Sequence, residues 1–326
     1  MSALLRVSDL TVEYDTLGGA LRAVDGVSFT IAPGETVAIV GESGSGKSSI
    51  AHALLRLIPR ASGRIAGGRI EFAGEDLAAL PEHAMRRVRG ARIGMIFQDP
   101  MMALNPVYTI GRQIAEPLLL HGSVPVRRAM DRVVELLTLV GVPAPEERIR
   151  QYPHNLSGGM RQRVMIAMAL ASGPRLLIAD EPTTALDVTV QAQVLALVDE
   201  LKARLGMAVL LITHDLAVVS EVAARVVVMY AGRKVEEGPV NEVFADPAHP
   251  YTRGLLAASD WSGDPRERLR EIPGTVPALA ELPEGCSFWP RCPDAEPRCR
   301  AARPAELASG ARRASCVHAE RIWRPS

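Results

Sequence analysis

The sequence predicts an α/β fold with a parallel sheet covered by helices, because three observations agree. Short apolar runs at 37–40, 176–179 and 208–212 have the length and β-branched composition of buried strands. Segments with helical spacing of apolar residues lie near these runs, and glycine or proline residues end several of them. Continuous apolar strands that alternate with helices are typical of a parallel sheet with both faces covered.

The first part of the chain has a different pattern. Residues 4–14 alternate roughly between apolar and polar side chains, and residues 23–31 read as a second strand. Such alternation is typical of antiparallel strands with one face on the core. The glycines around Gly67 and Gly68 predict a break, followed by a short strand at 69–73.

A helical region follows another predicted strand at 92–98. Apolar residues recur there at helical spacing over about 110–172, so we expect an inserted α-helical subdomain over about 99–172. After Ala245 proline becomes frequent and apolar runs become rare. This change predicts a separate, irregular C-terminal extension over 246–326.

Composition limits the class of protein. The chain has 326 residues, 48% of them apolar, which allows about two domains with buried cores. Lys and Arg total 37, as do Asp and Glu, so the net charge is zero and nucleic acid is not an expected partner. No apolar run reaches the ~18 residues of a spanning helix, and the first nine residues do not resemble a secretory signal. We therefore expect a cytosolic chain that reaches a membrane only through a partner.

A glycine-rich stretch at 41–48 reads Gly-Glu-Ser-Gly-Ser-Gly-Lys-Ser and fits the pattern G-x-x-x-x-G-K-[ST]. It lies between a predicted strand and a predicted helix, as this phosphate-binding motif requires. Glycines let the backbone wrap around an anion with its N–H groups inward, and the next helix adds the positive end of its dipole. Lys47 is expected to reach the β- and γ-phosphates of a nucleotide, and the Ser48 hydroxyl to bind Mg²⁺.

Two further segments indicate phosphate chemistry. Asp180 and Glu181 follow the apolar residues 176–179, so a buried strand presents two carboxylates at its end. In nucleotide hydrolases the first such carboxylate supports Mg²⁺ and the next polarises a water. Ser157 and the two glycines after it suit a helix N-cap with exposed N–H groups. That segment is either an anion site completed by another subunit or only a capped helix.

Six motifs resemble those of the ATP-binding subunits of ATP-binding-cassette (ABC) transporters, and they occur in the same order along the chain, within residues 4–245. The resemblance implies a P-loop NTPase (RecA-like) α/β core, with an antiparallel β subdomain and the inserted α-helical subdomain, in a nucleotide-binding domain at 1–245. The matching motifs are the two Walker motifs at 41–48 and 176–181, the family signature at 156–160, the lid glutamine Gln98, the D-loop at 185–187 and the switch histidine His214.

The resemblance also implies a role for each site residue. Two such subunits associate head to tail, so that ATP on the phosphate loop of one meets the signature of the other. Glu181 activates the water, His214 contacts the γ-phosphate, and Gln98 senses Mg²⁺ and the membrane partner. Tyr14 stacks on the adenine, unless it is a core aromatic residue. The implied nucleotide ligands are Tyr14, Gly41, Ser43, Gly44, Gly46, Lys47, Ser48, Ser49, Gln98, Ser157, Gly158, Gly159, Asp180 and Asp187, and the implied Mg²⁺ ligands are Ser48, Gln98 and Asp180.

Three stretches, at 98–106, 187–193 and 249–253, resemble one branch of this family, the oligopeptide, dipeptide and nickel importer ATPases. This implies import of di- or oligopeptides, with nickel or another small solute as an open alternative. The implied partners are a second ATPase subunit, often a paralogue, two transmembrane permeases and an extracytoplasmic solute-binding protein. The chain is then peripheral, on the cytoplasmic face of the plasma (inner) membrane. Two alternative classes remain: a soluble cassette ATPase that acts on nucleic acid or ribosomes, and a cluster-bearing regulatory protein whose ATPase activity is secondary.

Four cysteines occur in the chain, and all lie near its end with the spacing C-x5-C-x6-C-x16-C. In a reducing cytosol such a group favours a metal site over disulfides. The spacing fits neither the C-x2-C zinc pattern nor the common ferredoxin pattern. Similar cysteines in some members of this branch bind a [4Fe–4S] cluster, so this is the expected cofactor, and zinc or no metal are the alternatives. The cysteines are Cys286, Cys292, Cys299 and Cys316.

Overall fold

The structure is a computed structural model that describes residues 3–122, 124–182, 188–259, 271–319 and 323. The chain divides into two compact units. We call Met1–Ile31, Thr36–Ala78 and Thr213–Ser326 the phosphate-loop unit, and Ala32–Glu35 with Ala79–Ile212 the helical unit. Among the described residues, no helix has both the length and the apolar character needed to cross a membrane.

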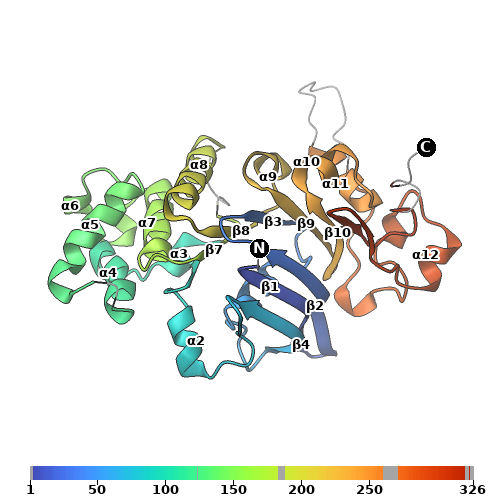
Figure 1. Cartoon of the computed structure of the whole chain (residues 1–326), viewed down its shortest axis with the longest axis horizontal. Coiled ribbons are helices and arrows are strands. Elements are labelled where there is room, and N and C mark those ends of the chain that lie inside the picture. Colours follow the sequence, from blue (N-terminus) through green and yellow to red (C-terminus); the bar gives the residue numbers. More distant parts are fainter. Residues whose placement is uncertain (1–2, 123, 183–187, 260–270, 320–322, 324–326) are drawn as a thin grey trace. The chain divides into compact units, whose positions relative to one another are not determined.

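The phosphate-loop unit contains two sheets and short helices, and its C-terminal part consists of the extension (Figure 1). Its elements are β1 (Leu5–Thr16), β2 (Gly19–Ile31), β3 (Thr36–Val40), α1 (Lys47–Leu54), β4 (Gly63–Phe72), β5 (Glu75–Asp76), α9 (Leu216–Val222), β9 (Arg225–Tyr230), β10 (Arg233–Pro239), α10 (Val240–Ala245), α11 (Pro250–Ser259), η3 (Leu279–Glu281), η4 (Trp289–Arg291), α12 (Pro297–Ala301), β11 (Leu307–Ser309) and β12 (Arg312–Ala314).

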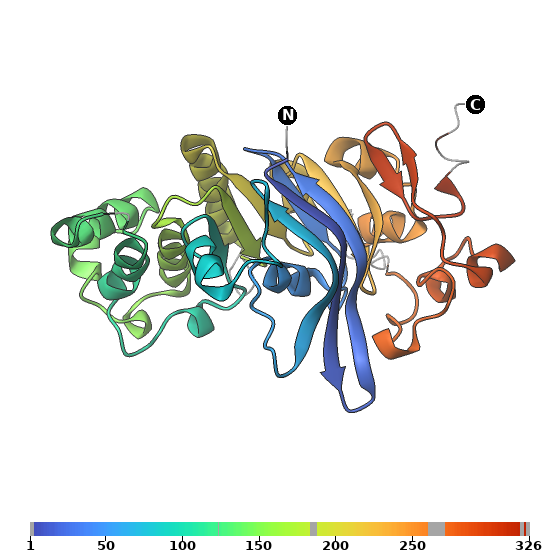
Figure 2. The same cartoon turned by 60° about the horizontal axis from the view of Figure 1, so that its bottom comes forward.

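The first sheet of this unit is antiparallel, with strand order β2-β1-β4-β5, as the alternating pattern predicts (Figure 2). The predicted break at Gly67 and Gly68 is wrong, because β4 continues through both residues. The pairing with β1 shifts register between Ser8 and Thr11, so two residues of β1, Asp9 and Leu10, lie opposite Gly68 alone and form a bulge. Gly68 has a φ of +90°, and a Cβ there would lie 2.5 Å from the carbonyl oxygen of Asp9. Only glycine fits this position without a shift of the backbone.

The second sheet has the order β11-β12-β10-β9-β3 within this unit. Strands β3 and β9 are parallel, and the other pairs are antiparallel. The extension is therefore less irregular than its composition predicts. Its strand β12 pairs with β10, and β11 pairs with β12 at the edge of the sheet. Alternation explains this pairing, since Arg312 and Ala314 are buried while Arg313 between them is exposed.

The extension also shares a core with β9. The rings of Tyr230, Tyr251 and Phe288 are all buried, and their centroids lie 4.6–5.4 Å apart. Tilted and edge-on aromatic contacts at such distances add to the energy of burial. The region around η4 is thus packed on the strand that lies beside β3.

The helical unit contains three parallel strands in the order β8-β7-β6, all fully buried as predicted for a covered sheet. Helices α4, α5 and α7 pack against one another in the inserted region (Figure 1). The elements of this unit are α2 (Glu82–Val88), β6 (Ile93–Ile96), α3 (Pro100–Ala103), α4 (Ile110–Leu120), η1 (Val126–Arg128), α5 (Ala129–Leu139), α6 (Pro145–Arg148), η2 (Pro153–Asn155), α7 (Gly158–Leu170), β7 (Leu176–Asp180), α8 (Val188–Leu205) and β8 (Ala208–Ile212).

Candidate functional site

The phosphate loop joins the buried strand β3 to helix α1, as its sequence predicts. Two of its glycines are required by close backbone contacts. A Cβ on Gly41 would lie 2.2 Å from the carbonyl oxygen of Met229, and one on Gly46 would lie 2.3 Å from that of Ala23. Gly46, with a φ of +98°, is the N-cap of α1 and provides no side chain to bond the first N–H groups of the helix. The N-terminus of a helix that follows such a loop is a typical place for an anion to bind.

Lys47 is buried at the first position of α1. Its ammonium group donates hydrogen bonds to the carbonyl oxygens of Gly41 at 2.8 Å and Glu42 at 3.0 Å. The cation is thus held within the loop, close to the backbone that would surround a phosphate group. Ser43 and Gly44, at the tip of the loop, are exposed.

Two other predicted residues of this unit lie close to the loop or to the strand before it. The hydroxyl of Tyr14 lies 3.3 Å from that of Ser49, so the ring of Tyr14 is beside the start of α1. Thr213 donates its N–H to Ile39 of β3 at 3.2 Å, and the exposed His214 comes next in the chain. Within the phosphate-loop unit, the structure therefore places Tyr14 against the first turn of α1, directly after the phosphate loop.

The helical unit brings together Gln98 and Glu181, which are 83 residues apart. The Gln98 amide donates to a carboxylate oxygen of Glu181 at 3.0 Å. Parallel strands β6 and β7 explain this contact, because their carboxyl ends lie at the same edge of the sheet. Asp180 is buried at the end of β7, and Glu181 has a φ of +45°, which is unusual for a residue with a side chain. Backbone strain of this kind costs about 1–3 kcal/mol and is concentrated at functional sites.

The signature segment forms a helix N-terminus, as predicted. Ser157 is the exposed N-cap of α7, and its hydroxyl accepts a hydrogen bond from the N–H of Met160 at 3.4 Å. Gly158 is exposed as well, and Gly159 is partly exposed. The predicted D-loop residue Asp187 lies outside the described residues.

The sequence did not predict that the extension contacts the phosphate loop. The carboxylate of Glu42 receives two hydrogen bonds from the guanidinium of Arg291, at 2.7 and 3.0 Å. The N–H of Glu42 donates to the hydroxyl of Tyr251 at 2.9 Å. Glu42 occupies a variable position of the loop motif, so no local pattern singles it out.

The four cysteines are free thiols in one region of the extension. Cys286 donates its N–H to the carbonyl oxygen of Cys299 at 2.9 Å. Burial raises the pKa of Cys316 to about 11, and the other three cysteines add to the rise. Burial also raises the pKa of Cys292 to about 11. In the described part of the chain, no group of three or more His, Cys, Asp or Glu side chains is placed to bind a single metal ion.

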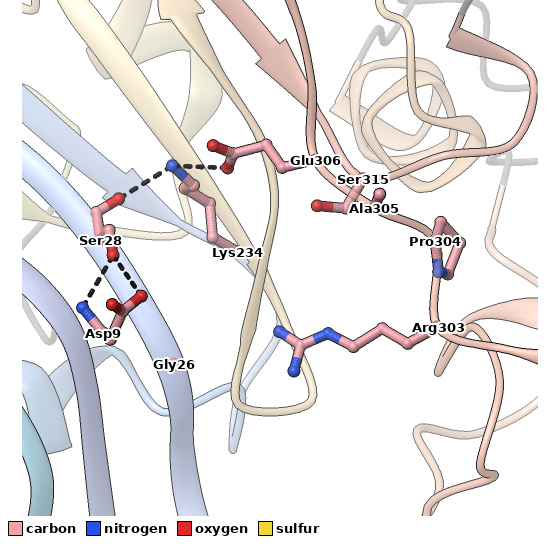
Figure 3. Close-up of a pocket in the computed structure, with 9 residues that line it drawn as sticks. All are labelled: Asp9, Gly26, Ser28, Lys234, Arg303, Pro304, Ala305, Glu306 and Ser315. Atoms are coloured by element: carbon pink, nitrogen blue, oxygen red, sulfur yellow. Dashed lines mark hydrogen bonds and ion pairs between the residues drawn. The ribbon is translucent and has the colours of Figure 1, made fainter.

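A pocket of about 360 Å³ lies where the extension meets β2 and β10. Lys234 crosses it, with its ammonium group 2.8 Å from both the carbonyl oxygen of Ser28 and a carboxylate oxygen of Glu306 (Figure 3). Arg303, also in its wall, pairs with Asp25 at 3.3 Å. These ion pairs join the extension to β2 and β10. Because both cations have acidic partners, the pocket does not have the character of an anion site.

A larger open groove of about 740 Å³ lies on the helical unit, between α4 and α5. Its wall is mixed, with apolar side chains beside Arg112 and Glu116. Leu120 is 75% exposed, and Leu119 and Met130 are exposed as well. Exposed apolar side chains around a groove indicate an interaction surface.

Known proteins resemble the chain over nearly its whole length. The ABC transporter family matches residues 24–184, and the C-terminal region of oligopeptide/dipeptide transporters matches residues 235–299. A putative peptide import ATP-binding protein of Brucella ovis is 54% identical over 312 residues, 92% of each chain. A protein of the same description from Brucella abortus is 51% identical, over 96% of this chain and 94% of the relative.

Solved structures agree with these sequence matches. An ATP-binding cassette, solved as a dimer after hydrolysis with ADP and phosphate, has a TM-score of 0.65 and 28% identity and covers 72% of this chain and 98% of its own. The structure of cbiO1 from Clostridium perfringens, part of an ABC transporter complex, has a TM-score of 0.63 and 29% identity. It covers 76% of this chain and 92% of its own. These likenesses confirm the predicted fold. The chain belongs to the ATP-binding subunits of ABC transporters and has the C-terminal region of the oligopeptide/dipeptide group.

Proposed function

We propose that this chain hydrolyses ATP to drive the import of di- and oligopeptides through a membrane ABC transporter. The main support for this proposal is the match of residues 235–299 to the C-terminal region of oligopeptide/dipeptide transporters, in a chain that also has the phosphate loop. The names of the relatives support the same solute class. Import of nickel or another small solute is the alternative.

The site residues have distinct roles in this proposal. N–H groups of the loop and of α1, with Lys47, bind the phosphates, and Tyr14 stacks on the adenine. Glu181 accepts a proton from the attacking water, and His214 contacts the γ-phosphate. Ser48, Gln98 and Asp180 offer oxygen atoms, which Mg²⁺ prefers, and the ion supplies charge stabilisation when bound. The remaining nucleotide contacts are Gly41, Ser43, Gly44, Gly46 and Ser49 of this chain, with Ser157, Gly158, Gly159 and Asp187 facing the partner.

The exposed start of α7 supports a head-to-tail pair of cassettes. Ser157 caps only part of the helix end, so its remaining N–H groups can meet the γ-phosphate on a second subunit. A similar cassette has been solved as a dimer with ADP and phosphate. We propose a second ATPase subunit, identical or a paralogue, two permeases and a solute-binding protein, with the chain on the cytoplasmic face of the plasma membrane.

The groove between α4 and α5 is the surface that we assign to the permease. Its occupant in this proposal is a short amphipathic helix from a cytoplasmic loop of the permease. An amphipathic helix suits a groove of this kind because its apolar side chains fill the surface beside Leu119 and Leu120, while its polar face meets Arg112 and Glu116.

Reconstitution tests the solute. The chain, co-produced with its permeases and binding protein, is placed in vesicles with ATP on the cassette side. We expect labelled peptides to accumulate, whereas uptake of nickel alone would overturn the peptide assignment.

Co-purification tests the docking surface. Leu120→Asp is expected to lose the permeases on purification and still bind ATP. The matched control is Leu17→Asp, because Leu17 is exposed on the β1–β2 hairpin. Equal loss of the permeases in both variants, or in neither, would contradict the groove assignment.

We also propose that the four cysteines bind a [4Fe–4S] cluster. Four thiolates are the ligand set that such a cluster needs. A four-iron cluster is wider than one ion, so its ligands lie farther apart than those of a single metal. Thiols that influence one another's pKa without forming a single-ion site are compatible with that wider spacing.

Metal analysis tests the cluster directly. Chain purified without oxygen is expected to contain about four iron and four sulfide per molecule. Cys299→Ser removes one buried ligand and is expected to lower both contents severalfold. The control is Ser287→Ala, beside Cys286, which leaves the ligand set intact. Zinc in place of iron, or neither metal, would overturn the proposal.

A further inference from the structure

The C-terminal extension contacts the second residue of the phosphate loop at two points. Arg291 forms a two-pronged pair with the carboxylate of Glu42, at 2.7 and 3.0 Å. Tyr251 accepts the N–H of the same residue at 2.9 Å. Two parallel bonds from a guanidinium fix orientation as well as distance. The extension thus fixes both the side chain and the peptide plane of Glu42.

The third polar group of Glu42 bonds to the lysine of the loop. Its carbonyl oxygen accepts from the ammonium group of Lys47 at 3.0 Å. The N–H, the carboxylate and the carbonyl oxygen of Glu42 are therefore all engaged, two by the extension and one by Lys47. A rotation of Glu42 that broke the contacts with Arg291 and Tyr251 would also move the oxygen that positions Lys47.

Arg291 is buried, whereas Glu42 is partly exposed. The Arg291 side chain is only 5% exposed, and it also donates to the carbonyl oxygens of Ile272 and Pro273 at 3.2 and 2.9 Å. The hydrogen bonds to Glu42 raise the pKa of Arg291, so the guanidinium stays charged. Loss of the Glu42 carboxylate would therefore leave the buried charge of Arg291 without its partner, which is unfavourable.

The segment that holds Arg291 also contains two cysteines. Arg291 ends η4, which lies between Cys286 and Cys292. Phe288, at the start of the same segment, packs against Tyr230 and Tyr251 with ring centroids 5.2 and 5.4 Å away. This segment therefore carries Arg291 and packs, through Phe288, on the ring of Tyr251, the other residue that contacts Glu42.

We propose that Arg291 and Tyr251 are positioning residues, through which the extension sets the conformation of the phosphate loop and hence its affinity for ATP. The proposal rests on the assigned role of the loop in nucleotide binding and goes beyond it by giving the extension a function in that site. Because coupling between sites is reciprocal, bound ATP also stabilises the extension in this position.

The test is a double-mutant cycle on the full chain, with ATP affinity measured by equilibrium titration. Arg291→Met keeps an unbranched apolar stem but removes the donors, and we expect about tenfold weaker binding. Glu42→Gln is expected to weaken binding to a similar extent, and the double variant no further. Arg291→Lys should restore part of the affinity. In steady-state assays the KM for ATP rises about tenfold, while kcat stays within about twofold.

The control is Arg298→Met, because the Arg298 guanidinium is about half exposed and pairs with a neighbour in sequence, Glu296, at 2.7 Å. The proposal is overturned if Arg291→Met binds ATP as tightly as the parent chain, or if the effects of Arg291→Met and Glu42→Gln simply add. If Arg291→Met does not fold, Tyr251→Phe decides, since it removes one hydroxyl and should still weaken binding severalfold. A parent chain that bound no ATP would instead refute the role of the loop.

Discussion

Replacing Glu181 with glutamine is expected to abolish ATP turnover, with kcat falling by about 10²–10⁴-fold while ATP still binds. Glutamine has nearly the same shape but cannot accept a proton from water. Its amide can still meet Gln98, which donates to Glu181 at 3.0 Å, so the end of β7 should keep its conformation. Phosphate release at saturating ATP measures turnover, and a titration with ATP measures binding.

The control for this variant is Glu221→Gln on α9, where the carboxylate is exposed. This change should leave both turnover and binding unchanged. Hydrolysis at the parent rate in Glu181→Gln would remove Glu181 from its role as the general base. A loss of ATP binding in that variant would show instead that the charge of Glu181 acts on the bound nucleotide.

The local parts of this site could be predicted because short sequence patterns mark them. The phosphate loop needs glycine at Gly41 and Gly46, where a Cβ would meet backbone oxygens, and the same glycines form the motif. Ser157 begins α7 because its side chain caps the helix. Such patterns are read within a few residues of sequence, although the oxygens that exclude a Cβ at Gly41 and Gly46 belong to Met229 and Ala23.

Contacts between distant segments could be predicted only where a topology rule joins them. Parallel pairing of β6 with β7 places Gln98 beside Glu181, and apolar runs predict that both strands belong to one sheet. No such rule joins Glu42 to Arg291, which are 249 residues apart and lie on a loop and in a short 3-10 helix. The bulge at Gly68 was missed for a related reason, because a glycine in a strand also fits a break.

Replacing Lys47 with methionine is expected to weaken ATP binding by roughly 10- to 150-fold, and hydrolysis at low ATP falls with it. A hydrogen bond to a charged group contributes about 1.5–3 kcal/mol, which corresponds to that range of affinity. Lys47 is buried and already points at the carbonyl oxygens of Gly41 and Glu42, so its charge is in place before the nucleotide arrives. Equilibrium titration with ATP measures the loss, with the melting temperature in the absence of nucleotide as a check of folding.

The control for the loop lysine is Lys202→Met on α8, where the ammonium group pairs with the neighbouring Asp199 at 2.6 Å. Ion pairs near the surface contribute little, so that variant should bind ATP like the parent chain. Lys47→Met and Glu181→Gln then separate ATP binding from ATP hydrolysis, because the first variant binds ATP more weakly and the second loses only turnover. If Lys47→Met bound ATP as tightly as the parent chain, the phosphates would not lie on the loop, and the assigned site would be wrong.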